Sequence, residues 1–307
     1  MHPLKQLVHN SDLMNSLAKE YGTPLYIYDA SRIRENVNII KNSLEKYFDK
    51  FHICYAIKSN SNPHLIKTML DTFPEMGGDC SSPGEIYAAE LSGIELSNCI
   101  YTGNYESKAD LSKALEKGCN INLDDTTSLD RLKTIGLPER ISFRLNPGFG
   151  KGTFSQITTA GRKAKFGIPT EKITDAYQKA INLGIKNFGM QCMVGSGNLD
   201  EEHFFDVISA IIKKTKSISS KLGIKFDFIS MGGGFGIPYK DNEIPINFDR
   251  LFSKLSDIFY KTYKHRIDSP ALWVEPGKSV IGDTGIILSK VTGVKKSYKN
   301  FIGIDAG

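Results

Sequence analysis

The sequence predicts an α/β protein built on a (β/α)8 barrel, also called a TIM barrel, with an incomplete second β domain. Two observations predict the barrel. Eight apolar runs of strand length recur along the chain, and amphipathic stretches of helical period lie between them. The alternation occupies roughly 220 residues, which fits the ~250 residues usual for this fold. A doubly wound open sheet is the structural alternative, because the same alternation builds it.

The strand-like runs contain many β-branched residues and are bounded by glycine, asparagine, aspartate or proline, which interrupt strands. In chain order they span residues 52–58, 77–82, 99–103, 121–125, 140–146, 187–195, 226–234 and 271–277. The amphipathic stretches between them span residues 63–72, 83–92, 108–117, 170–183, 201–222 and 248–264. A strand-like run at 25–29 and a helix at 31–48 precede the first barrel strand.

The segments outside the barrel indicate a second, β-rich domain. Residues 284–294 and 301–305 have strand character, with no helical stretch between them. We expect residues 1–29 to contribute a strand to this domain, residues 30–277 to form the barrel, and residues 278–307 to begin a C-terminal β domain that the chain leaves truncated. If the chain is a fragment of a longer product, the strands at 286–288 and 301–304 would lack sheet partners and would pair between chains.

The composition narrows the class of protein. A net charge of +5 is spread over short lysine runs without an arginine-rich tract, so nucleic-acid binding is not expected. The N-terminus lacks the apolar core of a signal peptide, and no stretch approaches the ~18 to 20 apolar residues of a membrane span. We therefore expect a cytoplasmic protein with no membrane partner. The five cysteines are odd in number and lack paired ligand spacing, which favours buried free thiols over disulfides or a metal site.

Polar residues and glycines close the strand-like runs. In a barrel the carboxyl ends of the strands form one face, and active sites lie there. We therefore expect these residues to share one site: Lys58, Asp79, Asn104, Asp124, Arg144, Ser196, Gly232, Gly233, Gly234 and Glu275.

Lys58 and Glu275 indicate a particular chemistry. A lysine at the rim of a buried strand can form a Schiff base with a carbonyl, which is the usual anchor of pyridoxal phosphate (PLP). A buried carboxylate facing the pyridine nitrogen would keep that nitrogen protonated and strengthen the ring as an electron sink. The alternatives are a solvated lysine at position 58 and a helix cap or surface charge at position 275.

The glycine run and its neighbours indicate a phosphate site. Gly232-Gly-Gly-Phe-Gly236 follows the seventh strand, and adjacent glycines let backbone N–H groups approach a phosphate. Ser196 could donate to the same phosphate, although both segments also suit ordinary turns. Arg144 offers a planar fork for phosphate or carboxylate. It could equally form a salt bridge with Asp124 or Glu275.

Together these segments resemble the fold-type III PLP enzymes, and most closely their decarboxylase branch, which includes diaminopimelate, ornithine and arginine decarboxylases. Diaminopimelate decarboxylases are the nearest match. The motifs that carry the resemblance occur in the family's order: Tyr55-Ala-Ile-Lys58, Asp79-Cys-Ser-Ser-Pro-Gly-Glu85, Lys165-Phe-Gly167, Gly195-Ser196, Gly232-Gly-Gly234 and Glu275-Pro-Gly-Lys278.

The resemblance implies pyridoxal 5'-phosphate as cofactor, an amino acid as small-molecule substrate and a homodimer as the assembly. It implies that Lys58 anchors the cofactor and is catalytic, that Glu275 faces the pyridine nitrogen, and that Asp79 and Glu85 lie near the lysine and the ring. The full set of cofactor residues is Lys58, Asp79, Glu85, Arg144, Met193, Ser196, Gly232, Gly233, Gly234, Glu275, Gly277 and Lys278.

Within that set, Ser196, Gly234 and the backbone around Gly277 and Lys278 would hold the phosphate. Three features depart from the family pattern. Met193 occupies the place of a histidine that stacks on the cofactor ring, and a thioether can also pack on an aromatic face. Lys278 replaces an arginine and loses its bidentate recognition of the substrate carboxylate. The family's segment with a cysteine and its tyrosine, which complete a dimeric active site, correspond to positions after residue 307.

The resemblance predicts a PLP-dependent carboxy-lyase that converts meso-diaminopimelate to L-lysine and CO2, a step of lysine biosynthesis. Two alternatives remain open. One is decarboxylation of another basic amino acid or diamine precursor, because the residues that select the substrate are those altered or absent. The other is a PLP-binding regulatory homologue without catalysis.

Overall fold

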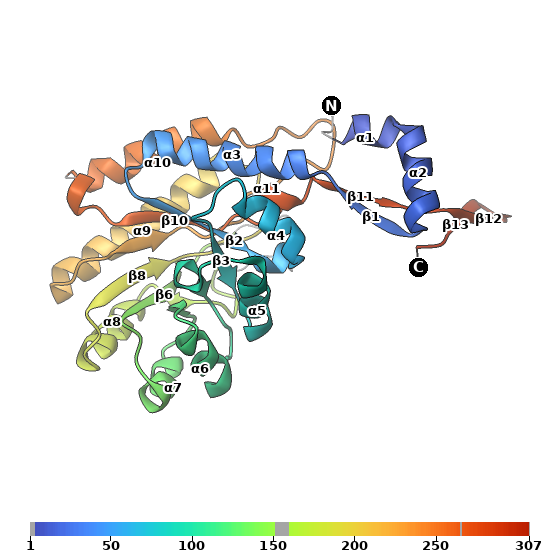
Figure 1. The fold of residues 1–307 in the computed structure, drawn as a ribbon. Helices are drawn as coiled ribbons and strands as arrows, with labels where there is room; N and C mark the ends of the chain where they lie inside the picture. The colour runs from blue at the N-terminus through green and yellow to red at the C-terminus, as the bar shows by residue number, and fades with distance from the viewer. Residues whose placement is uncertain (1–3, 151–159, 265, 307) are drawn as a thin grey trace.

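The computed structural model describes residues 4–150, 160–264 and 266–306, and its central feature is a closed barrel of eight parallel strands (Figure 1). The barrel strands are β2 (Phe51–Ala56), β3 (Gly77–Cys80), β4 (Ile100–Tyr101), β5 (Asn120–Leu123), β6 (Arg140–Asn146), β8 (Asn187–Gln191), β9 (Phe228–Ser230) and β10 (Ala271–Val274). They pair in chain order, and β10 pairs with β2 to close the barrel, with Leu272 opposite Phe51. The predicted barrel is therefore confirmed, and the open-sheet alternative is wrong.

Several barrel strands are shorter than the apolar runs that predict them. Strand β2 ends at Ala56, and Lys58 lies in the turn of 3-10 helix that follows, Ile57–Ser59. Strand β9 ends at Ser230, because the glycine run after it turns away from the sheet. A two-residue strand that the sequence does not predict, β7 (Ile168–Pro169), pairs with the end of β6.

Helices cover the outside of the barrel (Figure 1). They are α3 (Ala30–Tyr47), α4 (Pro63–Leu70), α5 (Pro83–Ser92), α6 (Lys108–Glu116), α7 (Thr127–Ile135), α8 (Ile173–Asn182), α9 (Glu201–Leu222), α10 (Phe248–Thr262) and α11 (Lys278–Ile281). The sequence does not predict α7, a short helix whose first N–H groups, those of Thr127 and Ser128, donate to the side chain of Asp125. Its buried apolar positions, Leu129 and Leu132, are too few to give a clear helical period.

The interior between strands and helices is apolar and aromatic. Phe143, Tyr177 and Phe188 are fully buried and meet edge to face. All five cysteines are buried and free, as predicted. No helix in the described part of the chain is both long and apolar enough to cross a membrane.

The flanking segments form two antiparallel strand pairs, which extend from the barrel together with α1 (Lys5–His9) and α2 (Ser11–Tyr21) in Figure 1. One pair is β1 (Leu25–Tyr28) with β11 (Gly285–Leu288), and the other is β12 (Val291–Lys296) with β13 (Asn300–Ile304). The single strand expected over residues 284–294 is thus two strands. The expectation that the strands near 286–288 and 301–304 lack sheet partners is wrong, because each has one neighbour within the chain.

Candidate functional site

A cavity of about 550 Å³ lies at the carboxyl ends of the barrel strands. Its volume falls within the range of small-molecule and cofactor sites. Ten of the twelve predicted cofactor residues line it: Lys58, Asp79, Arg144, Met193, Ser196, Gly233, Gly234, Glu275, Gly277 and Lys278. The barrel therefore brings together residues that are more than 200 positions apart in the sequence, as expected for strand ends that meet on one face.

Lys58 is held at the rim by an acid from the next strand. Its Nζ donates a hydrogen bond to the Oδ2 of Asp79, a buried carboxylate near the end of β3. Partial burial opposes the charged amine, but the carboxylates of Asp79, Glu275 and Glu85 outweigh that effect. The pKa of Lys58 consequently lies above its ordinary value, and the amine keeps its proton in the cofactor-free cavity.

Glu275 follows β10 and is buried. Its Oε1 accepts a hydrogen bond from Ser230 Oγ at 2.6 Å, and its Oε2 accepts one from Gln191 Nε2 at 2.9 Å. Burial and the negative charge of Asp79 raise the pKa of Glu275 above its ordinary value, although the two hydrogen bonds oppose the shift. A carboxyl group in this state needs a positively charged partner to ionise without penalty.

The glycine run after β9 brings backbone into contact with its neighbours. A Cβ on Gly233 would lie 2.1 Å from the carbonyl oxygen of Glu275, and one on Gly234 would lie 2.5 Å from that of Gly195. Gly234 also has a φ of +90°, which disfavours residues other than glycine. Only glycine fits at these two positions, and their backbone lines the cavity.

Met193 lies beside this run, in the loop after β8. Its sulfur accepts a hydrogen bond from the N–H of Gly233 at 3.3 Å, and the side chain lines the cavity. The thioether therefore links the loop after β8 to the loop after β9, and it is available to an aromatic ligand as a polarisable contact.

Arg144 forms a salt bridge with Asp124, one of the two acidic partners that the sequence allowed. Its Nε lies 3.7 Å from Oδ1 of Asp124, and its Nη2 donates to the carbonyl of Met193 at 3.4 Å. The guanidinium also lies over the ring of Phe166, 4.7 Å from its centre. The cation is thus fixed in the cavity wall by contacts from three directions.

The two predicted residues that do not line the cavity support it from behind. Glu85, in the first turn of α5, accepts a hydrogen bond from the N–H of Ser81 at 2.8 Å, and Ser81 lines the cavity. Gly232 accepts a hydrogen bond from the N–H of Glu275 at 2.8 Å and donates to Ser230 Oγ at 3.1 Å. Glu85 thus fixes the backbone of Ser81, and Gly232 fixes that of Glu275.

The sequence did not single out the residues that hold Glu275. Gln191 and Ser230 end β8 and β9, but both lie inside the longer apolar runs at 187–195 and 226–234, so the pattern carried no signal for them. Asn104, expected in the site as a strand-end residue, lines the cavity, and its Nδ2 donates to Oδ2 of Asp124 at 2.5 Å.

The donor set fits pyridoxal phosphate. An amine that can react with an aldehyde, a buried carboxylate that can hold a proton on a ring nitrogen, and glycine backbone that can approach a phosphate all line one cavity. Gln191 adds an orphaned polar atom, because its buried Oε1 has no hydrogen-bond partner in the described structure. A polar ligand in the cavity would supply one.

Comparisons with known proteins agree with this fit. Residues 31–282 match the family model "Pyridoxal-dependent decarboxylase, pyridoxal binding domain". The chain is 37% identical to the diaminopimelate decarboxylase of Methanothermobacter thermautotrophicus over 294 residues, which cover 95% of this chain and 68% of that protein. It is 36% identical to the diaminopimelate decarboxylase of Thermoplasma acidophilum, with 96% and 69% of the two chains covered.

Solved structures give the same result. Diaminopimelate decarboxylase from Helicobacter pylori, complexed with L-lysine, superposes with a TM-score of 0.85 at 28% identity and covers 95% of this chain and 73% of its own. The enzyme from M. jannaschii, also in complex with L-lysine, has a TM-score of 0.85 at 29% identity, with 95% and 69% covered.

Proposed function

Because the chain belongs to the pyridoxal-dependent decarboxylase family, we propose that it converts meso-diaminopimelate to L-lysine and CO2 with pyridoxal 5'-phosphate as cofactor. It is a carboxy-lyase, and its substrate is an amino acid. One observation of the site carries the proposal: Lys58, from the first barrel strand, and Glu275, from the last, line the same cavity. This arrangement suits a ring bound between an amine and an acid.

The residue roles follow from these positions. Lys58 binds the cofactor covalently, and Asp79 supports the charge of its nitrogen. Glu275 holds a proton on the ring nitrogen, with Ser230 and Gln191 fixing the orientation of its carboxylate. Met193 packs on the ring.

A group of lining residues from three loops suits the phosphate of the cofactor. Ser196, Gly233, Gly234 and the turn at Gly277 and Lys278 line the cavity together, and we assign the phosphate to them. Arg144 also lines the cavity, and Lys278 attracts a substrate carboxylate.

The bound cofactor would supply an electron-poor ring that can delocalise the electron pair left on the α-carbon when the carboxyl group departs as CO2. The protein contributes positions and protons. Once the substrate amine has displaced Lys58, Asp79 favours a protonated Nζ on the freed lysine, and that proton can replace the lost carboxyl group. A cation opposite Glu275 favours the ionised form of its carboxyl group, and that carboxylate in turn would stabilise the positive charge of the ring nitrogen. The apolar wall formed by Met193, Phe166 and Phe235 reduces access of water.

The first experiment tests cofactor and reaction together. The purified chain is mixed with pyridoxal phosphate and dialysed. We expect a visible absorbance band, release of CO2 from meso-diaminopimelate, and loss of both in Lys58→Ala. Lys41→Ala, a change at an exposed ion-paired lysine of α3, is the control and should behave like the wild type.

Each other outcome has a definite meaning. A colourless wild-type protein would contradict the use of pyridoxal phosphate. A coloured protein that releases CO2 only from another basic amino acid would move the substrate assignment to that compound. A coloured protein that releases none would leave a binding or regulatory role, which Met193 at the ring position favours.

We also propose a division into residues 1–29, which contribute β1 to a β domain, a barrel over residues 30–277, and the start of that β domain over residues 278–307. The pairing of β1 with β11 supports this division, since it joins the two flanks. A cytoplasmic location is proposed from the five buried free thiols, which are typical of a reducing compartment.

A homodimer is proposed from the surface of β12 and β13. The register of this pair places four apolar side chains on one face, and all four are exposed: Val291, Val294, Ile302 and Ile304. An apolar face of this kind is typical of a surface that contacts another chain.

A further inference from the structure

The chain passes between the barrel and the strand pair β1/β11 at two points that lie side by side. It enters the barrel at Asp29, between β1 and α3, and leaves it at Asp283 and Thr284, between α11 and β11. The N–H of Asp29 donates to the carbonyl of Thr284 at 2.8 Å, next to the last pair of the strand register, Tyr28 opposite Gly285. The two crossing points are therefore joined directly.

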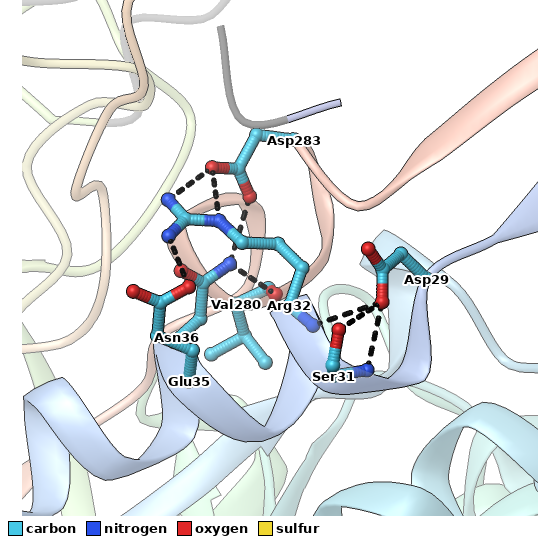
Figure 2. Close-up of polar contacts among 7 residues, drawn as sticks. All are labelled: Asp29, Ser31, Arg32, Glu35, Asn36, Val280 and Asp283. Carbon is cyan, nitrogen blue, oxygen red and sulfur yellow. Dashed lines mark hydrogen bonds and ion pairs between the residues drawn. The ribbon is translucent and has the colours of Figure 1, made fainter. Parts of the chain in front are cut away.

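Side chains of α3 reinforce this junction (Figure 2). Arg32 donates from Nε at 3.0 Å and from Nη2 at 2.6 Å to Oδ2 of Asp283. Asn36 donates from Nδ2 to the other carboxylate oxygen of Asp283 at 2.7 Å and to the carbonyl of Val280 at 3.0 Å. Both oxygens of Asp283 are thus engaged, and one contact reaches the backbone of α11 itself.

These contacts are sheltered from solvent. Asn36 is 5% exposed, and the side chains of Asp283 and Arg32 are 12% and 21% exposed. Hydrogen bonds to a charged group are stronger than neutral ones, and burial reduces their competition with water. The network therefore fixes geometry more firmly than a surface ion pair does.

Helix α11 needs such support. It has four residues, and a helix of that length is not stable alone. Val280 and Ile281 are buried, and α11 packs against α3. Its first residue, Lys278, and the residue before it, Gly277, both line the cavity. The position of residues 277 and 278 at the cavity rim therefore depends on the position of α11. The position of α11 depends in turn on its contacts with α3.

We propose that Arg32, Asn36 and Asp283 are positioning residues for the phosphate end of the cofactor site, acting through α11 on Gly277 and Lys278. The proposal rests on the proposed function, since it assigns that part of the cavity to the phosphate. None of the three residues lines the cavity. Their effect on the cofactor is therefore indirect, through the position of the rim.

The test separates positioning from plain stability by comparing two ligands. Pyridoxal phosphate and pyridoxal carry the same aldehyde, but pyridoxal has no phosphate group. Asn36→Leu removes the contacts with Val280 and Asp283 at similar volume, and Asp283→Asn disturbs the fork with Arg32 while keeping the shape of the side chain. For both full-length variants we expect roughly tenfold weaker binding of pyridoxal phosphate and nearly unchanged binding of pyridoxal, measured by absorbance titration.

A matched control is available at the other end of the same helix. Lys46→Gln breaks the exposed ion pair with Asp249 and should leave the affinity for both ligands unchanged. Thermal unfolding of the cofactor-free proteins shows whether each variant folds, and Asp283→Asn serves if Asn36→Leu does not. Equal losses for the two ligands, or no loss for either, would overturn the positioning role alone. A wild-type protein that binds neither ligand would overturn the proposed function, and this role with it.

Discussion

The surroundings of Glu275 favour its ionised carboxylate more when a positively charged ligand is bound than when the cavity holds no ligand. Without a ligand, Glu275 is a buried carboxyl group near the carboxylate of Asp79, and its pKa is raised. Its folded-state pKa therefore exceeds that of the unfolded chain. The stability that its protonated form contributes is fully present below the unfolded pKa and is lost as pH rises through the folded pKa.

The first prediction concerns Glu275→Gln, which keeps the shape of the side chain and removes its charge. In the cofactor-free protein we expect the variant to have the higher free energy of unfolding at about pH 8, by roughly 1–2 kcal/mol, and the advantage to shrink toward about pH 5. Urea denaturation at both pH values measures it.

The same variant should lose activity, because a neutral amide cannot hold the proton on the ring nitrogen. We expect kcat to fall about 100-fold. A variant less stable than the wild type at every pH would contradict the assignment of a buried, strained carboxyl group at this position.

The sequence predicted the residues that would react with the cofactor better than the residues that hydrogen-bond to them. Lys58 and Glu275 were predictable because each closes a strand-like run, and strand ends of a barrel share one face. The partner of Arg144 remained open, since Asp124 and Glu275 both close strands. Gln191 and Ser230 were missed because their contacts with Glu275 cross between strands, and a one-dimensional pattern does not contain those distances.

At the scale of elements, the loop after β9 is constrained by packing as well as by any ligand. The second prediction is that Gly233→Ala lowers the free energy of unfolding by about 1–3 kcal/mol, because the added Cβ would press on the backbone oxygen of Glu275. It should also weaken binding of pyridoxal phosphate. Urea denaturation and absorbance titration measure the two effects.

The control is Gly293→Ala on β12, where an added Cβ meets no atom within 4 Å. This change should alter the free energy of unfolding by no more than about 0.5 kcal/mol. Equal destabilisation by the two substitutions would show that loss of glycine, and not the close approach at residue 233, is responsible.

The elements themselves were predictable where their pattern is long and regular. The bounds of α5, α9 and β6 agree with the sequence pattern residue for residue. Strand β9 was overestimated because the apolar run continues into Met231 and the glycines, while the regular pairing of β9 with its two neighbours ends at Ser230, opposite Gln191 and Trp273. Apolar character therefore marks burial, and the hydrogen-bonding pattern decides where a strand ends.

At the scale of the whole molecule, the β12/β13 pair leaves an apolar face exposed. The third prediction is that the chain is a dimer at micromolar concentration and that Ile302→Lys shifts it to the monomer, because a charge on this face would have to be buried between subunits. Analytical ultracentrifugation measures the shift.

Phe301→Lys is the matched control, because the register places Phe301 beside Lys295 on the opposite face of the same pair. It should leave the dimer intact. A wild-type chain that stays monomeric at all concentrations would contradict the proposed interface.

The barrel was predictable as a whole because its eight repeats point to one architecture. The arrangement of the flanks was not predictable. Nothing in the pattern of residues 25–28 or 285–288 indicates that these strands pair with each other. A short turn sequence identifies two strands as a hairpin, but the whole barrel lies between these two.

That pairing has a consequence for biosynthesis. Leu25 and Leu288 are partners in one register, and a ribosome adding about 5–20 residues per second needs about 15–50 s to make the chain between them. Strand β1 waits for its partner β11 while the whole barrel is synthesised, and the barrel cannot close before β10 has followed β2. Both pairings join segments far apart in the sequence, so we expect closure of the barrel to be a slow step of folding.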